Sequence, residues 1–230
     1  DEASDGEFHV IGNIGKSSAE RLLSQAQQVA KTVKRTWKMN PKDPLVKGGI
    51  TLYALKSRYD YGELGKMLER RTLPSEWSAH WRKESPDLYI AMVNETSDPK
   101  FNESTLLHQL TSVWIASRDQ SPRWFAEGVG RNAMANAVGV NDARVQPWLR
   151  RFPEVVNELK NVQPIVEGKM NDEDEAVLGF GLVRKIQASP LRTKYELTLK
   201  QLVTATSFEE VFQRQFGPID TFLKQALGKP

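Results

Sequence analysis

The sequence predicts an α+β fold in which a small N-terminal mixed sheet with helices precedes a mostly helical C-terminal half. Segments of β-type composition occur only in the first hundred residues. From Asn102 onward, the apolar residues recur at helical spacing. No internal repeat or low-complexity tract is found. We therefore expect one domain over residues 1–230, with an α/β lobe over about 7–100 and a helical lobe over about 101–228.

Three segments of the N-terminal lobe are predicted to be strands, namely residues 8–11, 50–55 and 88–93. Two helices are expected between them. Ser17 and Glu20 form a capping box in front of the first helical pattern, and a polar helix is expected around residues 57–70. Trp77 and Trp81 are four residues apart, which predicts one helical turn or a packed loop.

The helical lobe contains several helix start and stop signals. Pro122, preceded by a serine, is typical of the first position of a helix. Residues 172–188 begin with four acids, which suit a helix N-terminus, and continue with a helical apolar pattern. Ser207 and Glu210 form another capping box, and Gly217 is expected to end the helix that follows.

The composition excludes several kinds of site and partner. Because there is no cysteine, disulfides, cysteine zinc sites and thiol nucleophiles are excluded. The three histidines, His9, His80 and His108, are too far apart in sequence for a cluster of several histidines in one short motif. The net charge of +3 is small and dispersed, so we expect no nucleic-acid partner. No apolar stretch is long enough to predict a membrane span.

A helix over residues 104–118 would separate an apolar stripe from a polar face. The stripe falls within roughly 120° of the helical wheel and consists of Leu106, Leu107, Leu110, Val113 and Trp114. His108 and Ser112 lie about 40° apart on the opposite side, with Gln109 between them and the stripe. We expect His108 and Ser112 to share a face that the main core does not use. Glu127, in the next helix, has small neighbours that allow close helix packing.

Residues 107–114 (LHQLTSVW) and 122–129 (PRWFAEGV) together resemble the active-site helix pair of gluzincin metallopeptidases, especially the peptidase MA-like group. In that family the first helix carries H-E-x-x-H and the second carries a glutamate within a W-x-x-E-G segment. The resemblance covers about residues 8–227, although only the two helices are specific. It implies a minimal thermolysin-like arrangement.

This chain departs from the family pattern at two of the four chemical positions. His108 occupies the place of the first zinc ligand and Glu127 the place of the third. Ser112 replaces the second histidine, and a neutral hydroxyl is a poor zinc ligand. Gln109 replaces the general base, and an amide cannot accept a proton near neutral pH. We therefore expect no zinc, no other cofactor and no peptidase activity by this mechanism.

Other roles are open for the remaining two residues. His108 can be a hydrogen-bonded histidine in a cleft or on the surface. Glu127 can pair with Arg123 or Arg131, which are four residues away on either side. If the family geometry holds, His108 and Glu127 are expected to form an imidazole–carboxylate hydrogen bond in the space of the missing metal.

The function expected from this pattern is that of an inactive metallopeptidase-like domain that binds a peptide or protein segment in its cleft or serves as a structural module. Gluzincins hold an extended peptide against an edge strand by main-chain hydrogen bonds, and these bonds need no metal. The predicted edge strand consists of Leu88, Tyr89, Ile90, Ala91, Met92 and Val93.

Two alternatives remain. One is a hydrolase with an altered metal site, in which His108, Glu127 and a carboxylate from residues 172–175 hold the metal and Ser112 or water completes the shell. The other is an assembly module of a larger multidomain protein. Members of the resembling families are often exported, which is compatible with a secreted or periplasmic location; the sequence itself decides neither the location nor the oligomeric state.

Overall fold

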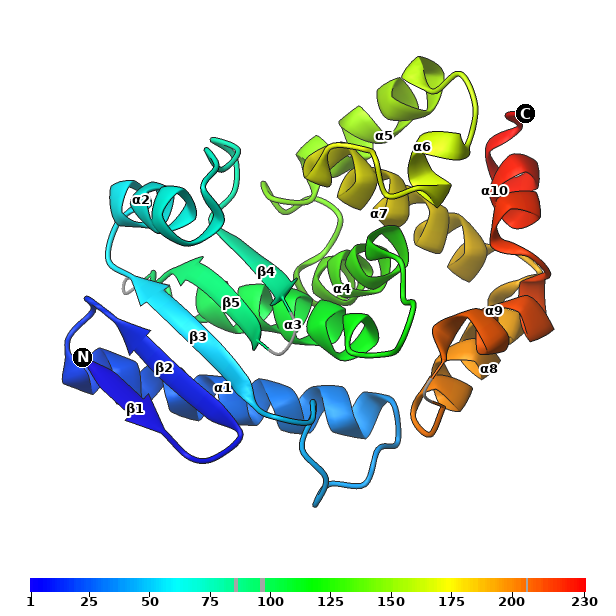
Figure 1. Cartoon of the computed structure of the whole chain (residues 1–230). Helices are drawn as coiled ribbons and strands as arrows, with labels where there is room; N and C mark the ends of the chain where they lie inside the picture. Colours follow the sequence, from blue (N-terminus) through cyan, green and yellow to red (C-terminus); the bar gives the residue numbers. More distant parts are fainter. Residues whose placement is uncertain (85–86, 96–97, 206) are drawn as a thin grey trace. The chain divides into compact units, whose positions relative to one another are not determined.

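The computed structural model describes residues 1–84, 87–95, 98–205 and 207–230, which form five strands and ten helices (Figure 1). The chain divides into two compact units, Asp1–Val113 and Trp114–Pro230. All five strands belong to the first unit, and the named elements that lie wholly in the second unit are helices. The predicted α+β class is therefore confirmed.

The first unit is built on a mixed sheet with the strand order β1-β2-β3-β5-β4. Its strands are β1 (Glu2–Ser4), β2 (Phe8–Gly12), β3 (Ile50–Leu55), β4 (Ala79–Glu84) and β5 (Asp87–Val93). β2, β3 and β5 are parallel to one another, whereas β1 and β4 run antiparallel to their neighbours. In the register of the sheet, Leu52 pairs with Val10 on one side and Ile90 on the other. The two edges of the sheet are β1 and β4.

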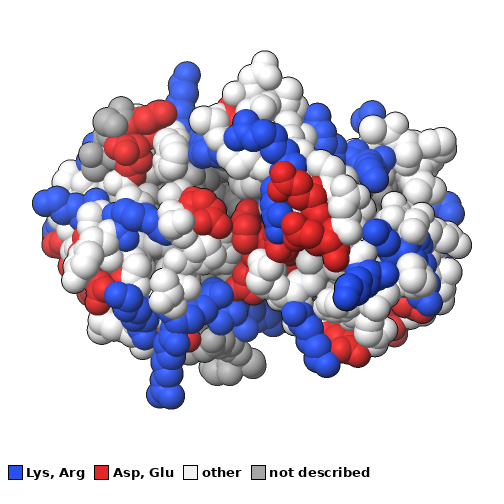
Figure 2. Space-filling view, turned by 90° about the horizontal axis from the view of Figure 1, so that it is seen from above, with Lys and Arg blue, Asp and Glu red and all other residues white. Residues whose placement is uncertain are grey.

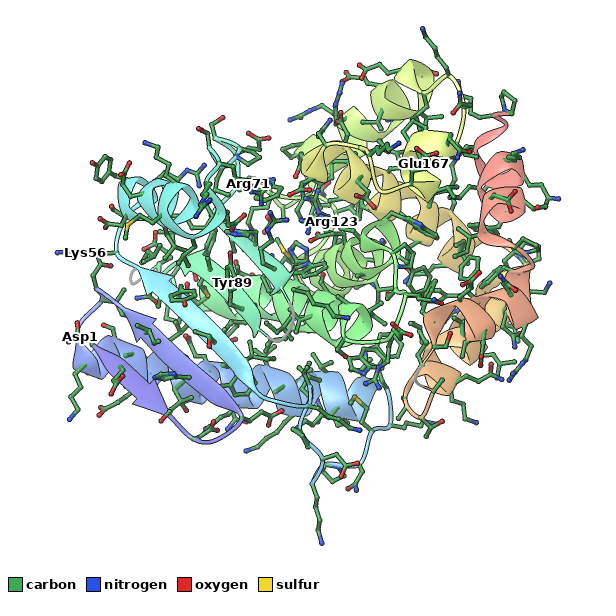
Figure 3. The ribbon with its side chains drawn as sticks, viewed as in Figure 1. Asp1, Lys56, Arg71, Tyr89, Arg123 and Glu167 are labelled. Carbon is green, nitrogen blue, oxygen red and sulfur yellow. The ribbon has the colours of Figure 1, made fainter. Side chains whose placement is uncertain are left out.

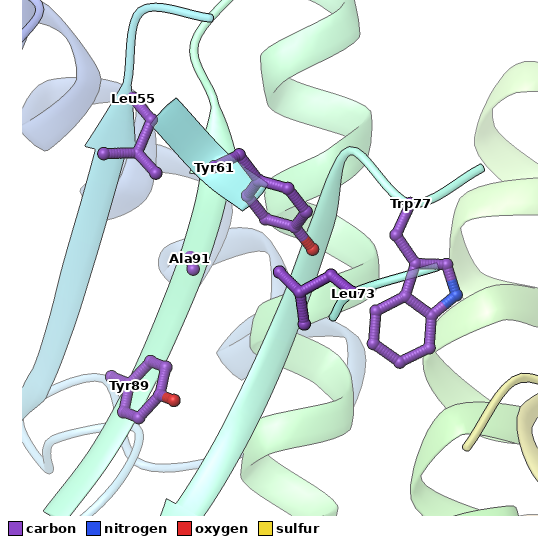
Figure 4. Packing of buried hydrophobic residues seen from close by; sticks show 6 residues of the cluster. All are labelled: Leu55, Tyr61, Leu73, Trp77, Tyr89 and Ala91. Atoms are coloured by element: carbon purple, nitrogen blue, oxygen red, sulfur yellow. The ribbon is translucent and has the colours of Figure 1, made fainter. Parts of the chain in front are cut away.

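Helices α1 (Lys16–Thr36) and α2 (Arg58–Glu69) cover opposite faces of this sheet (Figure 1). The face toward α2 holds a cluster of buried side chains from α2, the sheet and the loop before β4 (Figure 4). This cluster consists of Leu55, Tyr61, Leu73, Trp77, Tyr89 and Ala91. Ser57 caps α2, because its hydroxyl accepts a hydrogen bond from the Asp60 N–H at 3.2 Å.

Three predicted strands are confirmed as β2, β3 and β5; the predicted Ser17 cap is wrong, and the packed loop expected for Trp77 and Trp81 holds for Trp77 alone. The first helix begins at Lys16 rather than behind a Ser17 cap, because the Gly15 carbonyl already accepts the first helical hydrogen bonds. Trp77 and Trp81 do not share a helical turn. Trp81 lies in β4, opposite Ile90, and Trp77 lies in the loop before that strand.

The second unit contains the helices α4 (Arg123–Val138), α5 (Gln146–Glu158), α6 (Gln163–Val166), α7 (Asp172–Ala188), α8 (Arg192–Leu202), α9 (Phe208–Phe216) and α10 (Ile219–Leu227). Helix α3 (Pro99–Ala116) joins the two units. The predicted bounds of α7 are confirmed, as are the Ser207 cap of α9 and its end at Gly217.

Helices α4 and α7 cross closely at two glycines. A Cβ atom on Gly179 would lie 1.8 Å from the Trp124 carbonyl oxygen, and one on Gly128 would lie 2.4 Å from the Gly179 carbonyl oxygen. The buried amide of Asn132 links the same helices, because it donates to the carbonyls of Gly128 (2.8 Å) and Phe180 (2.9 Å). The predicted close packing beside Glu127 is thereby confirmed.

Two surface properties bear on possible partners. In the parts of the chain that the structure describes, no helix has both the length and the apolar character that crossing a bilayer requires. On the face seen in Figure 2, basic and acidic side chains are interspersed over the described residues.

Candidate functional site

Helix α3 carries three of the four predicted site residues, and hydrogen bonds tie its first turn to the end of β5. The Asn102 amide nitrogen donates to the Asn94 side-chain oxygen (3.0 Å) and to the Glu95 carbonyl (2.8 Å). The Asn102 side-chain oxygen accepts from the Glu95 N–H at 3.0 Å. These three bonds fix the point at which α3 leaves the sheet.

His108, Gln109 and Ser112 are all buried, with exposed fractions of 8%, 1% and 0%. The expectation that His108 and Ser112 lie on a face outside the core is therefore wrong. Apart from the half-buried Leu107, every residue of α3 from Leu106 to its end is buried. A helix buried on all sides has no solvated polar face, so its polar side chains must find partners within the protein or remain desolvated.

One polar contact within the site is well defined. The amide Nε2 of Gln109 lies 3.1 Å from Nδ1 of His108. Three nearby oxygens, Oε1 of Gln109, Oγ1 of Thr111 and Oγ of Ser112, have no hydrogen-bond partner among the described residues. Such desolvated groups each cost about 1–3 kcal/mol. This stretch of α3 therefore combines an engaged imidazole with several buried acceptors.

Glu127 lies on α4 in the second unit and faces two arginines of its own helix. Its Oε1 is 3.6 Å from Nη2 of Arg123, and its Oε2 accepts from Nε of Arg131 at 3.3 Å. Of the roles left open for Glu127, pairing with an arginine four residues away is therefore confirmed, and the structure shows it with both Arg123 and Arg131. Arg131 also donates two hydrogen bonds to the Glu173 carboxylate, at 3.0 and 2.7 Å, and its guanidinium lies 4.4 Å from the Trp148 ring centre. Glu127 is thus part of a buried ion-pair network.

The four acids at the start of α7 are similarly engaged. Glu173 pairs with Arg131, and Asp172 lies 3.8 Å from Nε of Arg123, which Figure 3 labels. Asp174 pairs with Arg151 at 3.0 Å. Glu175 is buried and accepts a hydrogen bond from the Trp124 N–H at the start of α4 (3.1 Å).

Burial dominates the electrostatics of Glu175. Burial raises the pKa of this carboxyl to about 7, against the opposing effects of Arg123 and the Trp124 N–H. The carboxyl oxygen caps the first turn of α4, whose own N-cap, Pro122, has no side-chain donor or acceptor to do so.

The donor set does not fit a zinc ion. Ser112 supplies a neutral hydroxyl, and both carboxylate oxygens of Glu127 face guanidinium groups. Within the described ranges, no group of three or more His, Asp or Glu side chains could hold a metal. A carboxylate from residues 172–175 would have to leave an arginine or a helix cap to complete such a site.

The predicted edge strand, Leu88 to Val93, is not at the edge of the sheet. β5 is paired with β3 on one side and with β4 on the other. The Asn94 N–H donates to the Leu55 carbonyl, and the Val93 N–H donates to the Ser78 carbonyl, both at 2.8 Å. The backbone N–H and C=O groups of β5 therefore pair with β3 on one side and β4 on the other, so a peptide cannot add beside this strand. The edge strand at this end of the sheet is β4.

Sequence reasoning did not single out a buried polar cluster that joins α2 to β4. The Glu69 carboxylate accepts hydrogen bonds from the Tyr89 hydroxyl (2.8 Å) and from Nε of Arg71 (2.6 Å), both residues labelled in Figure 3. It also contacts Nε2 of His80 and lies 3.1 Å from Nε of Arg82. Only 1% of this side chain is exposed. Burial alone would raise the pKa of Glu69, but His80 and the other donors lower it to about 2.

The other ring nitrogen of His80 faces Tyr61. The Tyr61 hydroxyl lies 2.6 Å from Nδ1, and burial raises the pKa of this phenol far above its usual range. The phenol therefore keeps its proton, and the His80 ring links it to the Glu69 carboxylate. Because each of these groups has a partner, the cluster holds β4 against α2. No signal in the sequence could have revealed it, since Glu69 and His80 belong to different elements.

Comparison with known protein families and with curated proteins finds no match for this chain. The likeness to gluzincins consequently depends on residues 107–114 and 122–129.

Proposed function

We propose that this chain is a catalytically inactive metallopeptidase-like domain that binds an extended peptide or protein segment. The observation that carries the proposal is the pair of replacements on α3, where Gln109 and Ser112 stand at the positions of the base and the second ligand. An amide can neither take a proton from water near neutral pH nor replace the missing imidazole. The arginines around Glu127 support the same conclusion for the third ligand position.

Peptide binding without catalysis would use the outer edge of β4. Ser78 and Val93 form a directly hydrogen-bonded pair, so the alternation of an antiparallel ladder gives the next such pairs at His80 and Arg82. The residues between them, Ala79 among them, direct their N–H and C=O groups away from β5. A strand edge with this geometry is the template for an added peptide strand.

The cluster around Glu69 supports this role for β4. It anchors His80 and Arg82, which point toward α2, and so holds the strand in a fixed position before any peptide arrives. A preordered edge reduces the entropy that binding must overcome.

A peptide-binding experiment with two variants of Ala79 tests the proposal. Purified protein is screened against a random peptide library in the presence of EDTA, and the affinities of the peptides found are measured by calorimetry. Ala79→Pro removes one outward N–H without removing a β4–β5 hydrogen bond, and Ala79→Ser is the matched control that keeps it. We expect binding that survives EDTA and weakens about five- to tenfold in Ala79→Pro only, since a main-chain hydrogen bond contributes ~1 kcal/mol.

Two results would contradict the proposal. An absence of any peptide binding would remove the binding function. Zinc-dependent peptide cleavage that is lost in His108→Ala would instead favour the hydrolase with an altered metal site.

A further inference from the structure

A pocket of about 390 Å³ lies in the first unit, where the loops before β2 and β3 meet the first residues of these strands. Helix α2 follows the carboxyl end of β3, whereas the pocket lies at the amino end of that strand (Figure 1). The volume falls within the range of small-molecule sites, about 300–1,000 Å³. The residues that line the pocket belong neither to β4 nor to the helices α3 and α4, so this is a separate site.

Three glycines of the two loops line the pocket. Gly6, Gly48 and Gly49 have φ values of 91°, 91° and 82°, in the left-handed region that favours glycine. A Cβ atom on Gly6 or Gly48 would meet no other atom within 4 Å, so the direction of the backbone, and not close packing, requires glycine there. The loops therefore present main-chain groups, without side chains, to this space.

Two acids hold these loops in place. The Asp5 Oδ1 accepts a hydrogen bond from the Glu7 N–H at 3.0 Å. The Glu7 carboxylate in turn accepts from the ammonium of the buried Lys34 at 3.0 Å and from the Leu45 N–H. The Ile50 N–H donates to the Glu7 carbonyl at 2.9 Å, which ties the second loop to the first. The wall of the pocket is therefore ordered before any ligand arrives, and the Glu7 carboxylate is already bound.

The side chains that line the pocket from the strands are two hydroxyls and an imidazole. Ser4, His9 and Thr51 are paired in register across β1, β2 and β3, so their side chains share one face of the sheet. Ser4 is exposed, and the other two are half-buried. Hydroxyl groups both donate and accept hydrogen bonds, and an imidazole has two ring nitrogens that can bond. This row therefore suits a ligand with several groups of both kinds.

We propose that this pocket binds a neutral, hydroxyl-rich small molecule, namely a sugar. Each sugar hydroxyl donates and accepts, as the hydroxyls of Ser4 and Thr51 do, and the glycine loops add main-chain groups. Tyr53 lies two residues beyond Thr51 on the same face of β3 and is half-buried, which places an aromatic ring beside the row for the apolar side of a sugar. This proposal does not depend on peptide binding at β4.

Other classes of ligand fit the described groups less well. An apolar molecule would desolvate the hydroxyls and main-chain groups without replacing their hydrogen bonds. Among the described residues that line the pocket there is no lysine or arginine to bind an anion, and Glu2, 3.4 Å from Nε2 of His9, would repel one. A cation would have to compete with Lys34 for the carboxylate of Glu7.

Protein-observed NMR tests the proposal. The ¹⁵N-labelled full chain is titrated with glucose, galactose, mannose and N-acetylglucosamine, and ¹H–¹⁵N spectra are recorded. We expect saturable shifts of the amide signals of Gly6, Gly48 and Gly49 with at least one of these sugars. Thr51→Val should weaken this binding about five- to tenfold, since it removes one hydroxyl at nearly constant shape.

Thr32→Val is the matched control, because its hydroxyl lies on α1 and bonds to the Gln28 carbonyl outside the pocket, so its affinity should be unchanged. If Thr51→Val does not fold, Ser4→Ala removes an exposed hydroxyl of the same row and should weaken binding similarly.

Three results would overturn the proposal. One is that none of the four sugars shifts the signals of the three glycines. Another is that glucuronate or glucosamine binds at these glycines whereas the neutral sugars do not, which would assign a charged ligand. The third is equal affinity in wild type, Thr51→Val and Ser4→Ala. A failure of peptide binding at β4 would leave the sugar titration unaffected, so the two proposals fail separately.

Discussion

Replacing Glu69 by glutamine removes the negative charge on which His80, Tyr89, Arg71 and Arg82 converge. The side chain is 1% exposed, so solvent screens these interactions little. The pKa of Glu69 is about 2 in the folded chain, against a reference value of 4.5. Through proton linkage, that difference corresponds to a stabilisation of ~3 kcal/mol at neutral pH.

The sign of the effect follows from the lowered pKa. Because the folded chain binds this proton less tightly than the unfolded chain, the stabilisation is complete above pH 4.5 and is lost as the pH falls toward 2. We expect Glu69→Gln to unfold at lower urea concentration at pH 7 and to show a flatter loss of stability between pH 5 and pH 3 than the wild type.

The assay is urea unfolding followed by tryptophan fluorescence at a series of pH values. Glu63→Gln is the matched control, because it neutralises an acid of the same helix whose side chain is 39% exposed and pairs with the exposed Lys66. Equal losses of stability in Glu69→Gln and Glu63→Gln at pH 7 would contradict this expectation. The same holds if the stabilities of Glu69→Gln and the wild type fall in parallel between pH 5 and pH 3.

Three further substitutions probe the second unit. Glu175→Gln removes a carboxyl whose pKa is raised to about 7 in the folded chain. The free energy of unfolding of the wild type should therefore fall by up to ~3 kcal/mol between pH 4.5 and pH 7, and that of the variant should not. An equal difference in stability between wild type and variant at pH 5 and at pH 7.5 would contradict this. Gly179→Ala places a Cβ 1.8 Å from the Trp124 carbonyl oxygen and should lower the stability by ~3 kcal/mol in thermal unfolding. Gly62→Ala, whose Cβ would meet open space on a helix, is the control and should be neutral or stabilising. Similar melting temperatures for the two variants would contradict the close crossing of α4 and α7. Arg131→Ala removes the guanidinium that pairs with the buried Glu127 and with Glu173, whose side chain is 18% exposed, and should cost ~3 kcal/mol in urea unfolding. Arg131→Lys, which loses the bidentate pair with Glu173, should not restore wild-type stability.

Elements with complete local signals were predictable from the sequence. Helix α7 combines acids in its first turn, an Asn171 cap and a helical apolar pattern, and its bounds match the prediction. β3 was predictable because its six residues have β-type composition between polar loops. Such signals act over one or two turns, so they need no knowledge of the tertiary structure.

β1 and β4 could not be predicted because their stability comes from other elements. β1 has three residues, of which only Ala3 is partly buried, and it forms by pairing with β2. β4 has charged and aromatic residues without apolar alternation, since His80 and Arg82 are satisfied by Glu69 from a different helix. Alternation of apolar and polar residues cannot indicate a strand whose buried side chains are themselves polar.

In the candidate site, too, only the contacts within one helix were predictable from the sequence. The pairing of Glu127 with Arg123 and Arg131 was predictable, because residues four apart on a helix are neighbours. Two other features were not predictable, because they depend on how helices pack. They are the bidentate pair of Arg131 with Glu173 and the complete burial of Ser112.

Zinc binding is the most direct test of the proposal that α3, with Gln109 and Ser112 at the positions of a base and a ligand, holds no catalytic metal. Protein purified without chelator is analysed for metal by mass spectrometry and then titrated with ZnSO₄ by calorimetry, with His108→Ala as the reference. We expect metal far below one zinc per chain and a titration indistinguishable from that of His108→Ala. One tightly held zinc per chain that disappears in His108→Ala would contradict it.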